Sequence, residues 1–115
     1  MIYHIATESE WELHKENSVY FPSKFEQVGF IHCSKANQIE KVANTFYASY
    51  TKLCLLFIDD NKEKEFIKYE NLEGGTELFP HIYRKLPKDS IIKTIQLEKK
   101  HKNASFEIQN ELLEV

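Results

Sequence analysis

Leu53-Cys54-Leu55-Leu56-Phe57-Ile58 is the longest unbroken apolar run in the chain, and two aspartates follow it directly. Six residues are too few for a typical buried helix, but they suit a strand that is covered on both faces. The run therefore predicts a central β-strand at residues 53–58. The same run is far too short to cross a bilayer.

The clearest helix is expected just before this strand, over about residues 35–50. Ser34 is its expected N-cap. A shorter helix is expected over residues 8–16, because Thr7 and Glu10 have the spacing of a capping box. The apolar residues of the longer helix recur at i, i+3, i+4, i+7 and i+8, which predicts one buried face: Ile39, Val42, Ala43, Phe46 and Tyr47.

Short strands are expected on both sides of these elements. Pro80 favours an edge or entry position for the strand that contains it. Residues 17–29 are expected to be irregular, with room for one helical turn, because Pro22 and Gly29 interrupt them. Besides the central strand, the pattern predicts strands at residues 2–6, 30–33, 66–69, 78–83 and 91–97.

This arrangement predicts an α+β fold, because most strands follow the second helix instead of alternating with helices. A chain of 115 residues is expected to form a single domain over residues 1–115. Residues 98–115 are charged at first, and we expect them to form a peripheral or partly disordered tail.

Charge and cysteine content narrow the classes of function. The net charge is only −3, so the sequence gives no basic field for nucleic acid. The two cysteines, Cys33 and Cys54, lie in apolar runs, which is typical of buried thiols in a reducing compartment. No signal peptide or membrane span is evident, and we expect a cytoplasmic protein. The sequence does not indicate an oligomeric state.

Three histidines in strand-like segments form the candidate site: His4, His32 and His81. Alternation places Phe30, His32 and Ser34 on one face of their strand, with Ile31 and Cys33 on the other. His81 and Tyr83 likewise share a face opposite Ile82. His14 and His101 lie in polar surroundings and are expected at the surface. Packing of each histidine in the core is the alternative interpretation.

Two other kinds of site are consistent with these residues. Three histidines can ligate zinc with an open fourth position, but the chain has no HxH or HxxxH pair, so no metal site is assigned. The start of the second helix, with Ser34 and Lys35, is a candidate anion site, and an ordinary helix cap is the alternative. The phosphate-binding GxGxxG and GxxxxGK[ST] motifs are absent.

The strings IYHI (residues 2–5), GFIHCS (29–34) and ELFPHIY (77–83) carry a resemblance to a known family. With these strings the sequence resembles a small bacterial family of domains of unknown function that has an ADP-ribosyltransferase-like fold. The resemblance covers about residues 1–97. Trp11, Ala43-Asn44, Phe46-Tyr47 and Glu70 also match positions of that family.

The resemblance implies two small, strongly bent sheets with an NAD-type cleft between them and two helices near the N-terminus. It also implies that His4 anchors the nicotinamide ribose, that His32 packs on the nicotinamide ring and that His81 stands where the superfamily uses a polar residue, often glutamate. Imidazole lacks the fixed negative charge of a carboxylate, which Glu70 or Glu77 would have to supply. Tyr83 and Arg84 complete the expected cofactor contacts, with Arg84 closing the cleft or binding phosphate.

The expected function is therefore binding of NAD or a related nucleotide as a small-molecule ligand, with ADP-ribosyl or phosphate transfer carried by His4, His32 and His81. A binding module that has lost catalysis is the first alternative. A metal-dependent hydrolase with three histidines is the second. Neither the substrate nor the reaction follows from the sequence alone.

Overall fold

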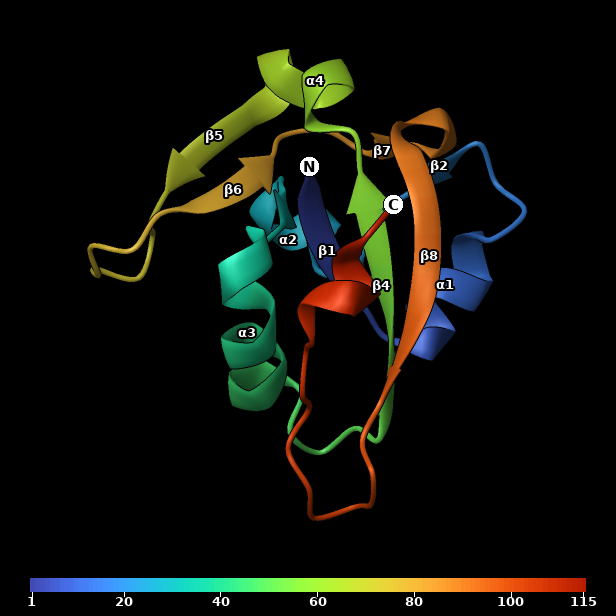
Figure 1. Cartoon of the computed structure of the whole chain (residues 1–115). Helices are drawn as coiled ribbons and strands as arrows, with labels where there is room; N and C mark the ends of the chain where they lie inside the picture. Colours follow the sequence, from blue (N-terminus) through green and yellow to red (C-terminus); the bar gives the residue numbers. More distant parts are fainter.

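A three-stranded antiparallel sheet with β4 (Lys52–Ile58) in its middle organises the molecule. The structure, a computed structural model, describes residues 1–115. β1 (Ile2–Ala6) pairs with one side of β4 and β8 (Ile91–Glu98) with the other (Figure 1). The prediction of a central strand at residues 53–58 is confirmed.

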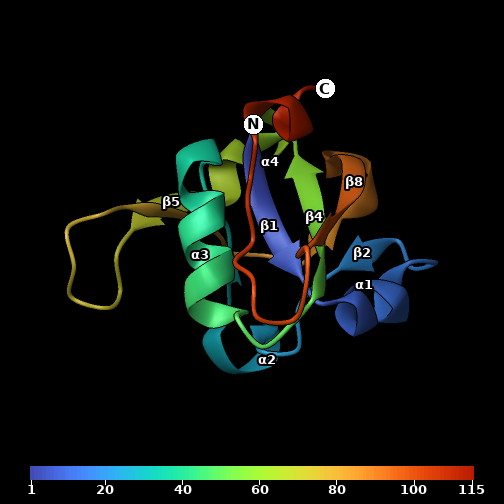
Figure 2. The ribbon, with the colours of Figure 1, turned by 60° about the horizontal axis from the view of Figure 1, so that its bottom comes forward.

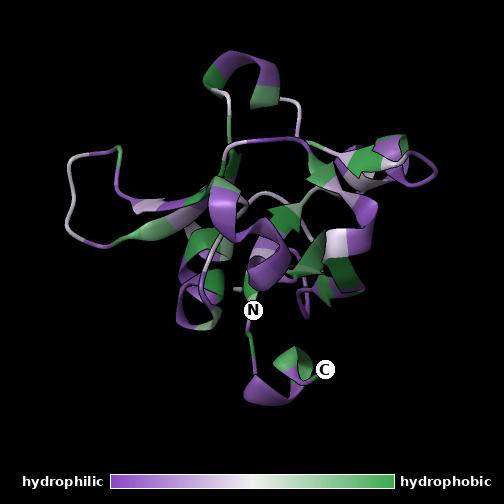
Figure 3. Ribbon diagram, turned by 90° about the horizontal axis from the view of Figure 1, so that it is seen from above, coloured by the Kyte–Doolittle hydropathy of each residue, from purple (hydrophilic) through white to green (hydrophobic).

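Apolar side chains cover both faces of this sheet, which explains why the β4 run does not alternate with polar residues. Residues of β1 divide between the two faces in the alternation expected of a strand. Figure 3 shows the hydrophobic ribbon gathered in the central strands. One core contains Tyr3, Ile5, Ile39, Val42, Ala43, Leu53, Leu55, Phe57, Leu97 and Phe106. The other contains Ile2, Ala6, Tyr20, Ile31, Cys33, Leu56, Ile58, Ile82 and Leu86.

A second antiparallel sheet has the order β3-β6-β5 and is called the cleft sheet below. Its strands are β3 (Ile31–His32), β6 (Phe79–Ile82) and β5 (Ile67–Glu70), and a separate pair joins β2 (Val19–Tyr20) to β7 (Leu86–Pro87). Figures 1 and 2 show the β5–β6 hairpin extending away from the central sheet.

Of the two positions expected for Pro80, the edge is wrong, because β6 is the middle strand of the cleft sheet, and the entry is confirmed, because Pro80 is the second residue of β6. Pro80 stands near the start of β6 and accepts a hydrogen bond from the Cys33 backbone amide at 2.9 Å. Proline has no backbone N–H, so the reciprocal hydrogen bond from residue 80 to β3 cannot form. β3 is two residues long and ends at His32, so the missing donor falls where the pairing already stops.

The helices are shorter and more numerous than predicted. α1 (Glu8–His14) has the predicted Thr7–Glu10 capping box. α3 (Ile39–Phe46) begins after a 3₁₀ turn, η1 (Ala36–Gln38), and not at residue 35. The structure adds two single-turn helices, α2 (Phe25–Val28) and α4 (Asp60–Glu63), so helix is not confined to two N-terminal segments. The helical turn expected within residues 17–29 is confirmed as α2.

Ser34 is not an N-cap, contrary to the prediction. Its backbone pairs with Tyr3 of β1 through two hydrogen bonds of 2.7 and 2.9 Å, so the chain is still extended at this point. The first turn begins at Lys35, whose amide donates to the Gln38 side chain at 2.9 Å. Phe46 also departs from the predicted buried face of the helix, because it is 59% exposed.

The C-terminal segment returns across the central sheet. Phe106 is 1% exposed within the first core, and Asn44 of α3 holds its backbone through two hydrogen bonds of 2.7 and 3.0 Å. Lys99 is buried and its ammonium group lies over the Phe106 ring. The remaining 3₁₀ helices are η2 (Lys64–Phe66), η3 (Lys88–Ser90) and η4 (Asn110–Leu113).

The observed class is α+β with small antiparallel sheets, as predicted. No helix has the length and apolar character needed to cross a membrane. Both cysteines are free, with Cys33 buried and Cys54 half-buried. His14 is buried against Phe21, with ring centroids 4.3 Å apart, so its expected surface position is wrong.

Candidate functional site

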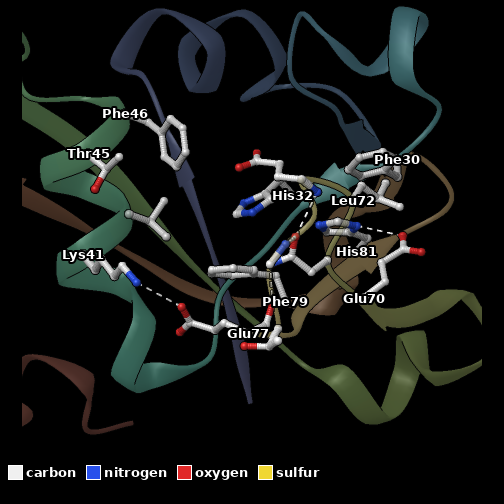
Figure 4. A pocket seen from close by; sticks show the side chains of 15 residues that line it. Phe30, His32, Lys41, Thr45, Phe46, Glu70, Leu72, Glu77, Phe79 and His81 are labelled. Carbon is white, nitrogen blue, oxygen red and sulfur yellow. Dashed lines mark hydrogen bonds and ion pairs between the residues drawn. The ribbon is translucent and has the colours of Figure 1, made fainter.

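A cleft of about 530 Å³ lies between the cleft sheet and α3. Its size falls in the range of small-molecule sites. One wall is the face of β3 and β6 that points away from the core, the opposite wall is α3, and the loop between β5 and β6 closes one end (Figure 4). The lining residues are Phe30, His32, Lys41, Val42, Thr45, Phe46, Glu70, Asn71, Leu72, Glu73, Gly75, Thr76, Glu77, Phe79 and His81.

The register of the cleft sheet brings His32 and His81 together. The two residues are directly opposed in the β3–β6 pair, and their ring centroids are 5.1 Å apart. Alternation turns their neighbours Ile31 and Ile82 inward to the second core. The predicted division of each strand into a histidine face and an apolar face is therefore confirmed for these four residues.

His81 is held by a carboxylate. Its Nδ1 lies 2.8 Å from Oε2 of Glu70, and the same oxygen accepts from the Tyr83 hydroxyl. The other oxygen of Glu70, Oε1, forms an ion pair with Lys68 at 3.4 Å. The hydrogen bond from Tyr83, followed by those from His81 and Lys68, lowers the pKa of Glu70. The carboxylate is consequently ionised at neutral pH and accepts hydrogen bonds only, so the proton between the two groups belongs to Nδ1 of His81.

The other ring nitrogen of His81 has no partner. His81 is 3% exposed, and its Nε2 is the single buried side-chain nitrogen or oxygen atom in the chain that makes no hydrogen bond. Figure 4 shows this nitrogen on the side of the ring away from Glu70, toward His32. Because Nδ1 is engaged with Glu70, Nε2 is the ring nitrogen that remains for a ligand. Buried polar atoms without partners are rare in folded proteins.

His32 lies between Phe79 and His81 on the cleft wall, with both ring centroids 5.1 Å from its own. Burial, together with the neighbouring His81 and His4, lowers the pKa of His32 to about 4. The ring is therefore neutral at physiological pH, and it offers one acceptor nitrogen and one donor to the cleft.

His4 is next to the site but does not line it. It is 4% exposed on β1, where its Nδ1 donates to the His32 carbonyl at 2.7 Å and its Nε2 accepts from the Tyr20 hydroxyl at 2.9 Å. Burial lowers the pKa of His4, which keeps the ring neutral. Both ring nitrogens make hydrogen bonds within the protein, so His4 has no free nitrogen for a ligand. Its bond to the His32 carbonyl holds the backbone of His32 in place.

A shared site for a metal ion is not formed by these histidines. No group of three or more histidine, cysteine, aspartate or glutamate side chains in the chain has a geometry that could hold a metal ion. The hydrogen bonds of His4 explain this result, since a ligating imidazole needs a free ring nitrogen.

The other predicted cofactor residues lie around the cleft and not in its lining. Ser34 is buried in the bridge to β1, and Lys35 is exposed before η1. Tyr83 supports Glu70 from the rim. Arg84 is engaged elsewhere, because its guanidinium makes two hydrogen bonds of 2.8 and 2.9 Å to the buried carboxylate of Glu63.

Sequence reasoning missed most of the other lining residues. Phe30 stacks on His81 with centroids 4.3 Å apart, and its alternation with His32 was the available signal. Lys41 and Thr45 of α3 were not considered, although they stand one helical turn apart. The β5–β6 loop had no functional signal beyond the mention of Glu77, which pairs with Lys41 at 3.1 Å.

Comparisons with known proteins find a family and one solved relative. A family model described as "Protein of unknown function (DUF952)" matches residues 5–94. The crystal structure of protein CC0527 from Caulobacter crescentus is 26% identical, with 97% of each chain covered and a TM-score of 0.83. A double mutant of that protein gives the same values. Its solution NMR structure is 27% identical over 90% of each chain, with a TM-score of 0.76. None of the curated proteins matches.

Proposed function

The chain belongs to the DUF952 family of proteins of unknown function, and from the chemistry of its cleft we propose that it binds NAD or a related nucleotide and uses His81 for proton transfer. The observation that carries the proposal is the pair of environments at one ring, with Glu70 on Nδ1 and no partner on Nε2. A carboxylate that fixes the tautomer and leaves the far nitrogen free is the usual support of a histidine base.

The walls of the cleft suit a nucleotide. Rings from Phe30, His81, His32 and Phe79 follow one another along the cleft sheet. A flat base gains dispersion and electrostatic contact when it stacks on such a row. Thr45 and other polar groups of the lining are available for ribose hydroxyls. A few polar groups within an apolar lining are typical of cofactor sites.

The reaction that we propose is transfer of the ADP-ribosyl group. An acceptor hydroxyl attacks the ribose carbon, the carbon–nitrogen bond to nicotinamide breaks, and its electron pair neutralises the pyridinium ring. The hydroxyl proton moves to Nε2 of His81, and Glu70 stabilises the imidazolium that forms. The same proton transfer would serve attack on a phosphate. Within this proposal the two bent sheets form an ADP-ribosyltransferase-like fold, and His4 positions His32 without contact with the ligand.

The test is calorimetric titration with NAD together with chromatographic measurement of nicotinamide release. His81→Asn keeps a polar side chain but removes the base, so turnover is expected to fall about 10²–10⁴-fold. The NAD affinity is expected to fall much less than the turnover does, since Phe30, His32 and Phe79 of the aromatic wall remain. Glu70→Gln is expected to reduce turnover less, and His101→Asn, in the exposed C-terminal segment, is the matched control.

Two results would contradict the transfer reaction. Release of nicotinamide by His81→Asn at the unaltered rate would remove His81 from the chemistry. Binding of NAD without any turnover by the unaltered protein would favour a binding module that has lost catalysis. Absence of NAD binding would overturn the nucleotide proposal itself.

A further inference from the structure

We infer that the cleft selects the cationic, ribosylated ring of its ligand and leaves phosphate groups outside, so that the affinity comes from the N-ribosylated pyridinium end of the ligand. This inference rests on the proposed function and narrows it. It follows from the charge of the lining, the aromatic wall and the free acceptor on His81.

The charges of the lining are unfavourable for a pyrophosphate. Three carboxylates and one ammonium group line the cleft: Glu70, Glu73, Glu77 and Lys41. Lys41 is paired with Glu77 at 3.1 Å, and Lys68 at the rim is paired with Glu70 at 3.4 Å. Glu73 has no ion pair. Within the lining a phosphate group thus meets no unmatched cation, and Lys35 is the one unpaired lysine near Glu77, whereas a cationic ring meets an excess of negative charge from the lining.

Hydrogen bonds keep two of these carboxylates ionised. The bond from Lys41, and then that from Gln38, lowers the pKa of Glu77. The Tyr83 hydroxyl does the same for Glu70. The negative potential of the lining therefore persists at neutral pH, and it does not depend on a bound counter-ion.

The aromatic wall favours the same charge. Phe30 and Phe79 stand at the two ends of the ring row, and the imidazole of His32 between them is neutral. Phenyl faces attract cations through their quadrupoles, and the attraction increases when the cation is withdrawn from water. A pyridinium ring that stacks on this wall gains more than a neutral ring of the same shape.

The unpartnered atom of His81 points to a ligand and identifies its hydrogen-bonding type. Nε2 is buried and has no partner, and in the ring that acts as a base it accepts a hydrogen bond, because the proton is on Nδ1. In that state phosphate oxygens, which are also acceptors, cannot satisfy it. A ribose hydroxyl or a carboxamide N–H can donate to it, and both belong to the nicotinamide riboside half of NAD.

Four probes test the inference by calorimetry at neutral pH and low salt: nicotinamide riboside, its uncharged dihydro form, NAD and ADP-ribose. The riboside and its dihydro form differ in charge but hardly in shape. The riboside is expected to bind at least about fivefold more tightly than the dihydro form, as a desolvated cation–π contact implies. It is also expected to bind more tightly than ADP-ribose, and added salt should reduce its affinity.

A variant that removes one negative charge from the lining tests whether this charge causes the preference for the riboside. Glu73→Gln removes a carboxylate that holds nothing else in place, and it is expected to weaken binding of the riboside about threefold while the dihydro form is unaffected. Glu111→Gln, outside the cleft in η4, is the matched control. Equal affinities for the riboside and its dihydro form, or tighter binding of ADP-ribose than of the riboside, would overturn the inference. The second result would leave the nucleotide proposal intact, whereas no binding of any probe would remove that proposal as well.

Discussion

The central sheet and the cleft sheet each bury a histidine, but the two rings differ in the hydrogen bonds of their nitrogens. His4 of the central sheet and His81 of the cleft sheet are 4% and 3% exposed. His4 has a hydrogen bond on each nitrogen, whereas Nε2 of His81 has none. An unmade hydrogen bond at a buried group costs about 1–3 kcal/mol. The comparison indicates that the first ring serves stability and the second is kept for a ligand.

The same substitution in both regions gives the largest expected effect. His4→Ala leaves a cavity and unpairs the His32 carbonyl and the Tyr20 hydroxyl, so the free energy of unfolding is expected to fall by about 3–5 kcal/mol. His81→Ala removes an atom that is already unpaired, and Glu70 keeps its other partners, so a loss of about 1–2 kcal/mol is expected. Urea denaturation measures both.

A milder variant separates the two contributions at His4. Tyr20→Phe removes only the hydroxyl that donates to Nε2 of His4, and about 1–2 kcal/mol of stability is expected to be lost. If His4→Ala and His81→Ala lost equal free energy, the contrast between a structural and a functional histidine would fail.

The second effect concerns pH, because both regions bury imidazoles whose pKa is lowered. In the folded protein His32 stays neutral down to about pH 4, and the pKa of His4 also lies below its ordinary value of 6.5. In the unfolded chain these two histidines take up protons around pH 6.5, whereas in the folded protein they do not. Lowering the pH therefore stabilises the unfolded chain relative to the folded protein. Between pH 7 and pH 6 the protein is expected to lose about 0.5–1 kcal/mol through His32, and His4 acts in the same direction.

Denaturation at pH 7, 6 and 5 measures this dependence. His32→Gln is expected to remove the contribution of His32, about 0.5–1 kcal/mol between pH 7 and pH 6, and His101→Gln, outside both regions, is the control. Glu70 and Glu77 have lowered pKa values and so contribute only below about pH 4.5, outside this range. An unaltered slope in His32→Gln would contradict a neutral, desolvated ring in the cleft wall.

The smallest effect is local to the cleft sheet. The hydrogen bond to Glu70 raises the pKa of Tyr83 to about 12. Glu70→Gln removes the charge, so the pKa of Tyr83 is expected to fall by about 1–2 units toward its ordinary value of 10. Carbon NMR of the tyrosine rings follows this change, with Tyr83→Phe to assign the signal. A pKa that stayed near 12 would show that Glu70 is not the acceptor.

The sequence predicted the strands well because their hydrophobic patterns are local. The buried run of β4, the Thr7–Glu10 capping box and the inward direction of Ile31 and Ile82 all follow from spacing within a few residues. The extended backbone at Ser34 was not predicted, because it depends on a bridge to Tyr3, which is far away in the chain.

The site was predicted only in part, because some of its contacts also join residues that are far apart in the chain. His32 and His81 were named, and the β3–β6 register then brought them together. His4 was named with them, but its role depends on the Tyr20 hydroxyl and the His32 carbonyl, which no local pattern connects. The α3 wall was not predicted, since the exposure of Phe46 at the cleft depends on how that helix packs on the sheet.

The position of β8 and Phe106 late in the chain has a consequence for synthesis. β4 has its full set of backbone partners only when residues 91–98 pair with it, and the first core is filled only when Phe106 arrives. A chain emerging from the ribosome therefore exposes one edge of its most apolar strand until residues 91–98 have also emerged. Pairings of such large sequence separation also make folding slow. During this interval the unfinished chain is most open to a chaperone or to aggregation.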